Sequence, residues 1–213
     1  MLTLWGNADS VNVQKITWAC DELAVPVHRI DAGRHFGVVD TPAFRALNPN
    51  GLVPTIDDDG VVVWESGAIL RYLCARHGAG TLWPVDAAAR ADADRWIDWS
   101  GSTLWPALVP LFRAFHRTPA GQRDAGAIAA WTREALAAMR ILDAHLGRHA
   151  HVGGEAFTMG DIAVGCAAWR WFALPLPRDA VDAGDARLPH ATRWMHALQA
   201  RPAFDRHVWL LPS

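Results

Sequence analysis

The sequence predicts a small α/β domain followed by a larger all-helical domain. Two observations lead to this fold class. Up to about residue 79, short apolar segments of strand length alternate with segments in which apolar residues recur every three or four positions. From about residue 87 onward only the helical spacing is found. We therefore predict an α/β domain over 1–79 and an all-α domain over 87–213.

The composition is that of a globular protein and excludes several classes of function. Hydrophobic residues make up 51% of the 213 residues and charged residues 20%, which provides ample apolar material for a packed core. The formal net charge of −2 gives no electrostatic reason to bind nucleic acid or an anionic membrane. No segment approaches the roughly 20 apolar residues of a membrane helix.

The amino terminus and the cysteines indicate a cytoplasmic protein. Met1 to Trp5 meets Gly6 too early for a signal peptide. Cys20, Cys74 and Cys166 are widely separated and form no CxxC pair, so we expect neither a disulfide framework nor a zinc site.

The first domain opens with a β-α-β unit. Residues 2–5 alternate like a short strand, and residues 27–30 form a second strand candidate. Between them a helix begins at Val11 and ends before Pro26. Its apolar face is marked by Val13, Ile16, Cys20 and Leu23, so Cys20 is interpreted as a packing residue.

The rest of this domain is predicted as a short helix, a hairpin and a longer helix. Residues 32–40 are expected to be irregular, and Thr41 followed by Pro42 is typical of a capped helix start. A strand ending in the acidic turn Asp57–Gly60 and the β-branched run after it predict a hairpin. A helix follows from Ser66 to about residue 77, and residues 81–85 are interpreted as a linker.

Four helices are predicted in the second domain, over about 87–116, 123–148, 158–171 and 189–200. Pro106 and Pro110 each remove a hydrogen bond from the first of these, so we expect a kink or break there. The third begins with a capping-box pattern, in which Thr158 at the cap is followed three residues later by Asp161.

Four short motifs in order resemble the glutathione S-transferase family. They are Ser-x-Asn-x-x-Lys at 10–15, Asn-Pro-Asn-Gly-x-Val-Pro at 48–54, Glu-Ser-x-Ala-Ile at 65–69 and Phe-Thr-x-x-Asp-Ile-Ala at 157–163. The resemblance covers nearly the whole chain. It implies a thioredoxin-like domain that binds glutathione, a helical domain that contributes the electrophile pocket, and a homodimer. The implied reaction is attack of the glutathione thiolate on small hydrophobic electrophiles, with glutathione as co-substrate and no metal.

In relatives with this loop, the hydroxyl residue donates to the glutathione sulfur and the nearby asparagine shares the task. The resemblance therefore assigns catalysis to Ser10 first and Asn12 second. Both residues lie where a loop enters a helix, so the hydroxyl, the amide and the helix N–H groups can converge on a thiolate. The structural alternatives are a helix N-cap for Ser10 and an ordinary polar first-turn residue for Asn12.

The remaining glutathione contacts are also carried over by resemblance. Val53 and Pro54 are similar to the family's cis-proline pair, whose free backbone groups bind the cysteinyl part of glutathione; an ordinary trans proline is the alternative. Glu65 and Ser66 resemble the pair that holds the γ-glutamyl end, with a helix cap and an exposed acid as the alternative.

One position departs from the family pattern. Leu52 stands where many relatives carry a basic residue that meets the glycyl carboxylate. Arg34 or His35, in the irregular loop, is expected to supply that charge, and Phe36 to form a lid over the same end. The alternative for Arg34 is a solvated loop charge.

The electrophile pocket is expected between the domains. Its candidate wall residues share one predicted helix: Trp105, Leu108, Phe112, Phe115 and His116. The alternative for each is core packing, and we prefer that interpretation for Trp96 and Trp99. His145 and His149 are one helical turn apart and His151 follows, but no carboxylate or cysteine stands at ligand spacing. We therefore expect cations at a helix end rather than a metal site.

Two other functions remain compatible with the sequence. The same site could reduce glutathione mixed disulfides or hydroperoxides, or the fold could serve as a non-catalytic binding module. If the protein is a dimer, Asp94 and Asp98 could reach glutathione in the second subunit; otherwise they are solvated charges on a helix face.

Overall fold

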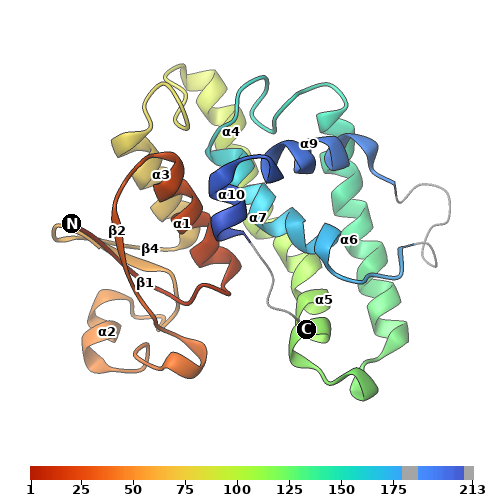
Figure 1. The fold of residues 1–213 in the computed structure, drawn as a ribbon, viewed down its shortest axis with the longest axis horizontal. Coiled ribbons are helices and arrows are strands. Elements are labelled where there is room, and N and C mark those ends of the chain that lie inside the picture. Colours follow the sequence, from red (N-terminus) through yellow and green to blue (C-terminus); the bar gives the residue numbers. More distant parts are fainter. Residues whose placement is uncertain (179–186, 209–213) are drawn as a thin grey trace.

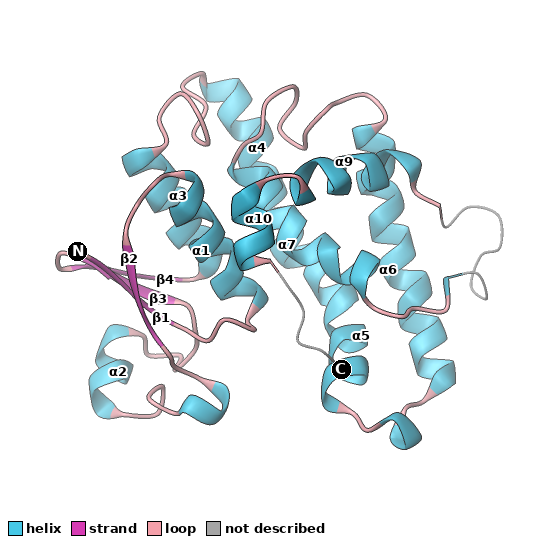
Figure 2. Ribbon diagram, in the orientation of Figure 1, coloured by secondary structure: helices cyan, strands magenta, loops and turns pink. Residues whose placement is uncertain are grey.

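A computed structural model describes residues 1–178 and 187–208 of the chain (Figure 1). A four-stranded sheet with its helices forms one half of the molecule, and a bundle of helices lies beside it (Figure 2). The predicted fold class, α/β followed by all-α, is confirmed. No helix in the described ranges is both long and apolar enough to cross a membrane.

The sheet contains all four predicted strands, β1 (Leu2–Trp5), β2 (Val27–Ile30), β3 (Thr55–Asp58) and β4 (Val61–Trp64). Their order is β2-β1-β3-β4. β1 and β2 are parallel with Leu2 opposite Val27, and β3 is antiparallel to both β1 and β4. In the hairpin turn the Asp57 carboxylate accepts a hydrogen bond from the Gly60 N–H at 2.7 Å, which favours this tight connection.

Helices α1 (Val11–Glu22) and α3 (Ser66–His77) pack against each other beside the sheet. The shorter α2 (Pro42–Leu47) lies on the other side, where its Phe44 ring meets Trp5 edge-on at a centroid distance of 6.5 Å. The predicted cap of α2 is confirmed, because the Thr41 hydroxyl accepts a hydrogen bond from the Phe44 N–H at 3.2 Å.

The helical half contains α4 (Ala87–Trp99), α5 (Trp105–Arg117), α6 (Ala125–Leu146), α7 (Met159–Ala173), α9 (Pro189–Gln199) and α10 (Pro202–His207). The sequence pattern ended the last helix near Arg201 and missed α10. Pro202 stands in the first turn of α10, where its missing N–H has no intrahelical partner to lose, so the proline starts a new helix after ending the previous one.

The helix predicted over 87–116 does not break at its prolines. Instead, residues Ser100–Leu104 form a π-helical turn in which the Trp105 N–H bonds the Ser100 carbonyl, five residues back. Pro106 then occupies the first turn of α5, and the helix continues through Pro110. The wider turn therefore lies upstream of both prolines, between α4 and α5.

Helix α7 forms the centre of the helical half, and most of its side chains are buried. The predicted capping box is present, with Asp161 Oδ2 accepting from the Thr158 N–H at 2.9 Å. Trp18 of α1 is fully buried and meets Phe204 of α10 edge-on at 5.1 Å. Apolar packing is therefore continuous from the sheet-bearing half into the helical half.

Ion pairs also join the two halves. Arg201 forms a bidentate pair with Glu22, with both N–O distances at 2.7 Å. Arg71 of α3 contacts Asp94 at 2.5 Å and Asp98 at 2.6 Å. Asp94 and Asp98 are therefore engaged within this chain, where they fix α3 against α4.

Candidate active site

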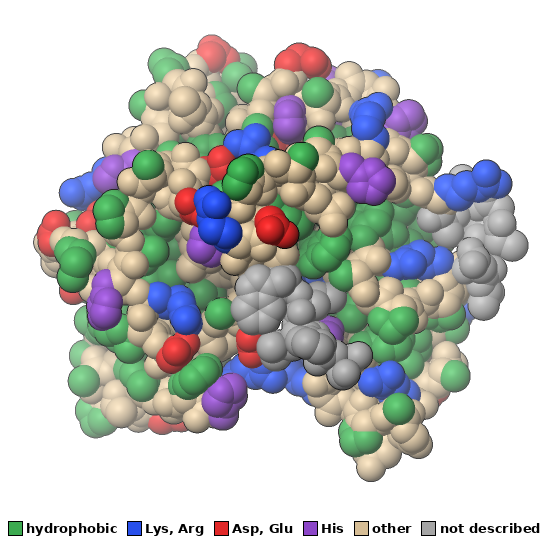
Figure 3. Space-filling view, viewed as in Figure 1, with side chains coloured by type: hydrophobic (Ala, Val, Ile, Leu, Met, Phe, Trp, Pro, Cys, Tyr) green, Lys and Arg blue, Asp and Glu red, His purple; other side chains and the backbone are tan. Residues whose placement is uncertain are grey.

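A cavity of about 550 Å³ lies between the sheet-bearing half and α5. Its lining residues come from four segments, within 7–12, 33–40, 51–53 and 105–117. Figure 3 shows a hollow at the lower edge of the molecule, between the parts around α2 and α5, with lysine or arginine atoms at its base. The fold thus places loops of the first half opposite one helix of the second.

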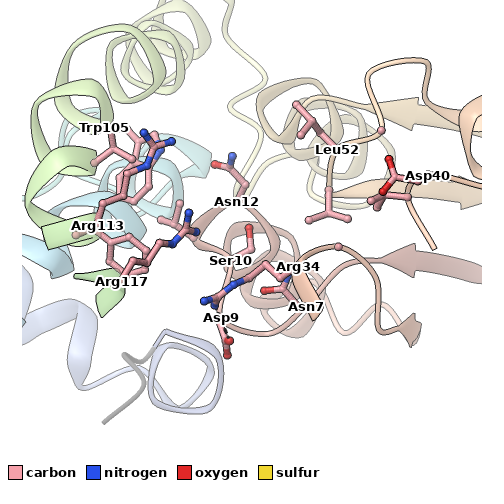
Figure 4. A pocket seen from close by; sticks show the side chains of 17 residues that line it. Asn7, Asp9, Ser10, Asn12, Arg34, Asp40, Leu52, Trp105, Arg113 and Arg117 are labelled. Atoms are coloured by element: carbon pink, nitrogen blue, oxygen red, sulfur yellow. Dashed lines mark hydrogen bonds and ion pairs between the residues drawn. The ribbon is translucent and has the colours of Figure 1, made fainter. Parts of the chain in front are cut away.

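Ser10 occupies the N-cap position of α1 and lines the cavity. Its hydroxyl makes no capping hydrogen bond, although its carbonyl accepts from the Gln14 N–H at 2.9 Å. Ser10 therefore stands at the N-cap position, but its hydroxyl oxygen does not cap the helix. In Figure 4 it lies in the middle of the site, so the hydroxyl is available to a bound group near the positive end of α1.

Asn12 lines the same cavity, one helical turn from Lys15. The Lys15 ammonium donates to Asn12 Oδ1 at 3.1 Å. An ammonium has only donors, so the carbonyl side of the amide is occupied and its NH₂ group is left to donate elsewhere. Asn12 is thereby oriented as a hydrogen-bond donor.

Lys15 is 5% exposed, and burial lowers its pKa to about 8, with Cys166 and Glu65 opposing the shift and Arg170 adding to it. Arg170 is fully buried, and burial likewise lowers its pKa to about 10. Its guanidinium donates to Gln14 Oε1 of α1 at 2.7 Å. Two buried cations therefore create positive potential beside the start of α1, which favours a bound anion such as a thiolate.

The loop before β3 is organised by Asn48, which is 2% exposed. Its amide nitrogen donates to the Leu52 carbonyl at 2.9 Å and to the Thr55 hydroxyl at 3.0 Å. The Val53–Pro54 peptide bond is cis, as the resemblance implied. Within residues 1–178 and 187–208, no group hydrogen-bonds the N–H or C=O of Val53, a cavity-lining residue.

Glu65 and Ser66 stand at the junction of β4 and α3 and are not among the residues that line this cavity. Glu65 has a backbone φ of 68°, a conformation uncommon for a residue with a side chain and one that clusters at binding sites. Its negative charge opposes the lowering of the Lys15 pKa, which burial causes.

The loop expected to supply a basic residue contributes one cation to the cavity. Arg34 lines it and pairs with Asp9 at 3.0 Å. His35 and Phe36 stack on each other at a centroid distance of 4.1 Å but do not line it. Leu52 lines it and is 63% exposed.

The candidate pocket residues of α5 divide into two groups. Trp105 and Phe112 line the cavity, with ring centroids 5.9 Å apart. Leu108 is fully buried in the core, and Phe115 lies beneath the guanidinium of Arg123. His116 packs on Phe112, and its pKa is lowered by burial and by nearby arginines, first Arg170.

The sequence analysis missed several polar residues of the cavity wall, among them Asn7, Arg113 and Arg117. The spacing of Arg113 and Arg117 with Trp105, Val109 and Phe112 was the available signal, since residues three and four apart share one helix face. Asn7 carried no such signal. It is 1% exposed, and its Oδ1 has no hydrogen-bond partner in the part of the chain described.

The cysteines and histidines do not form a second reactive centre. All three cysteines are unpaired and buried, and burial raises the pKa of each to about 12. The described residues contain no group of three or more histidines, cysteines or acids placed to hold a metal ion.

The expectation that these histidines act as cations is wrong for His145. Burial lowers its pKa, and it stacks on Trp96 at 4.6 Å while bonding the Val152 carbonyl at 2.9 Å. It is therefore mainly an uncharged packing residue at neutral pH. The packing interpretation of Trp96 is confirmed, since this side chain is buried.

Comparisons with known proteins agree with this architecture. Family models for the glutathione S-transferase N-terminal and C-terminal domains match residues 4–81 and 125–197. Glutathione S-transferase GstB of Escherichia coli K12 is 39% identical over 100% of this chain and 99% of its own length. Glutathione S-transferase 3 of Zea mays is 30% identical over 99% of this chain and 95% of its own length. The theta class glutathione S-transferase of Xanthomonas axonopodis pv. citri, solved with glutathione bound, has a TM-score of 0.90 at 40% identity, covering 100% of this chain and 98% of that one.

Proposed function

The chain belongs to the glutathione S-transferase family, and from that premise we propose that Ser10 and Asn12 activate the thiol of glutathione. The fold is a thioredoxin-like domain followed by the family's helical domain, and the protein is a glutathione transferase. One observation carries the proposal: Ser10 and Asn12 line one cavity at the start of α1. The Ser10 hydroxyl makes no capping hydrogen bond, and the Asn12 amide is oriented by Lys15.

The chemistry follows from how a thiol ionises. A free thiol has a pKa of about 8.5, and only its thiolate is a strong nucleophile. Hydrogen bonds from Ser10 and Asn12, the N-terminal end of α1 and the buried charges of Lys15 and Arg170 all stabilise the anion. The thiolate then attacks an electrophilic carbon, forming the C–S bond as the leaving group departs with its electron pair.

We assign the rest of glutathione by the groups available around the sulfur. The unpaired N–H and C=O of Val53 suit the cysteinyl backbone. Ser66 and Glu65, at the start of α3, suit the carboxylate and ammonium of the γ-glutamyl end. Arg34 is the cavity-lining cation proposed for the glycyl carboxylate, in the absence of a basic residue at Leu52.

The test is an ultraviolet difference titration of glutathione bound to the purified protein across pH. We expect thiolate absorbance well below pH 8 in the wild type, and a rise of the thiol pKa by about one unit or more in Ser10→Ala or Asn12→Ala. Thr192→Ala, which removes a hydroxyl of α9 outside the cavity, is the control. A thiol pKa near 8.5 in the wild type would contradict the assignment.

Parallel turnover assays separate transfer from the alternatives. A chloronitroaromatic electrophile reports transfer, and a glutathione mixed disulfide reports reduction on the same site. All three cysteines are buried, and burial raises the pKa of each thiol, so we expect a reduction to use a second glutathione rather than a protein cysteine. Binding of glutathione without either reaction would favour a binding module.

We also propose a homodimer. The strand β4 exposes the apolar side chains of Val61, Val62 and Trp64 to between 38% and 43% in the single chain. An apolar strand at the edge of a sheet favours association with another surface. Sedimentation velocity should give twice the mass of the chain, and a monomer at micromolar concentration would contradict this.

A further inference from the structure

Two arginines of α5 form the wall of the cavity that faces the proposed catalytic residues. Arg113 and Arg117 are one helical turn apart, so their side chains leave the same face of the helix. In Figure 4 both lie on the α5 side of Ser10 and Asn12. Trp105, also a cavity-lining residue, belongs to the same wall.

The carboxylates that line the cavity are already paired with other cations. Asp9 bonds Arg34 at 3.0 Å, and Asp40 bonds Arg45 at 2.9 Å. Among residues 1–178 and 187–208, no carboxylate is paired with Arg113 or Arg117. The α5 wall therefore carries two positive charges that no described acidic group in the cavity compensates.

The positive charges around Arg117 affect its pKa. Its pKa is lowered by partial burial and then by the charges of Arg34 and Arg113. The guanidinium of Arg117 is thus repelled by those of Arg34 and Arg113, which line the same cavity. A bound anion would relieve that repulsion, and paired guanidinium groups suit a carboxylate because each offers parallel N–H donors.

The location of these arginines separates them from the loop of Leu52 and Val53, which is proposed to bind the cysteinyl part of glutathione. Leu52, next to Val53, lies on the opposite side of Ser10 from Arg113 and Arg117 (Figure 4). The arginines line the same wall of the cavity as Trp105 and Phe112. The rings of these two residues form an apolar surface suited to the second substrate. The arginines are therefore placed to contact the electrophile rather than the peptide.

We propose that the electrophile of this transferase carries a carboxylate, which Arg113 and Arg117 bind while its apolar part lies against Trp105 and Phe112. This inference rests on the proposed function and narrows its substrate class from small apolar electrophiles to anionic ones. In a displacement, the glutathione thiolate forms the C–S bond at the activated carbon. The C–halogen bond breaks, the halide leaves with the electron pair, and the thiol proton passes to solvent.

The test compares two chloronitroarenes that differ in one group, 4-chloro-3-nitrobenzoate and 4-chloro-3-nitrobenzamide. The measured quantity is the ratio of their kcat/KM values in the wild type, Arg113→Gln, Arg117→Gln and Arg133→Gln. Arg133 is exposed on α6 outside the cavity, so its variant removes one positive charge elsewhere. We expect a fall in the benzoate-to-benzamide ratio of roughly tenfold or more for each cavity variant, and no change for Arg133→Gln.

Three results would overturn the inference while leaving the transferase intact. One is an equal loss with both electrophiles, and another is a ratio that the cavity variants leave unchanged. The third is a rise in the KM for glutathione that is the same with either electrophile, which would assign the arginines to glutathione instead. Absence of turnover with both compounds in the folded wild type would overturn the proposed function itself.

Discussion

The ammonium of Lys15 donates a hydrogen bond to the side-chain carbonyl of Asn12 at 3.1 Å. This contact joins a buried cation to a residue that lines the cavity, within one turn of α1. It orients the Asn12 amide and brings positive charge to the site where a thiolate would form. Both effects can be tested separately.

Replacing Lys15 by methionine should raise the thiol pKa of bound glutathione by about one unit or more. The variant removes the donor that orients Asn12 together with a nearby positive charge. The difference titration described above measures it. Arg170→Met is the matched comparison, because it removes the other buried cation and leaves the Lys15–Asn12 bond in place. An equal shift in both variants would show that charge alone acts and that the orientation of Asn12 is unimportant.

The burial of Lys15 also predicts how stability depends on pH. Its pKa is about 8 in the folded protein against 10.5 for a free side chain, so between these values the unfolded state binds more protons. The free energy of unfolding of the wild type should therefore rise with pH from about 8 to 10.5, relative to Lys15→Met. The lowered pKa sets an upper limit of about 3 kcal/mol. Urea denaturation of both proteins across this range measures it, and a constant difference would contradict the low pKa.

Asp161 should be among the residues on which stability depends most. Its buried carboxylate accepts hydrogen bonds from the Val152 N–H at 3.0 Å, the Thr158 N–H at 2.9 Å and Trp194 Nε1 at 2.8 Å. Asp161→Asn replaces one acceptor oxygen by a donor, so we expect a loss of about 3 kcal/mol in urea denaturation. Asp124→Asn is the control, since Asp124 caps α6 at the surface and asparagine caps equally well. Equal losses in the two variants would contradict this.

Gly160 should not tolerate a methyl group. A Cβ atom there would lie 2.7 Å from the backbone oxygen of Ala93 and 3.0 Å from Val152, where α7 meets α4. We expect Gly160→Ala to lower the free energy of unfolding by about 2 kcal/mol. At Gly101 a Cβ atom meets nothing within 4 Å, so Gly101→Ala should leave stability unchanged or raise it by up to about 1 kcal/mol. Thermal or urea denaturation of both variants compares them directly.

Much of the architecture could be predicted from the sequence because the relevant signals are local. The spacing of apolar residues predicts the strands and the main helices, and Thr41 and Thr158 mark two helix starts through contacts three residues away. The positions of the prolines were less informative. A proline starts one helix at residue 202 and is tolerated inside another at 110, and only the surrounding packing distinguishes these cases.

The residues of the site likewise divide into those that the sequence predicts and those that only the folded structure identifies. Sequence motifs alone led to Ser10, Asn12 and Val53, since each is recognised by its near neighbours in the chain. The charge of the cavity could not be predicted from such motifs, because it depends on which charged side chains the folded chain brings together.

The sequence by itself determined the order of the elements and the residues at the start of α1. The tertiary structure decided that Asp9 pairs with Arg34, and that the arginines of α5 face Ser10 and Asn12 across one cavity. The physical reason is range: hydrogen bonds and periodicity within an element act over a few residues. Electrostatic balance instead depends on side chains far apart in the sequence, such as Asp9 and Arg34 at a separation of 25 positions, that only the folded chain brings together.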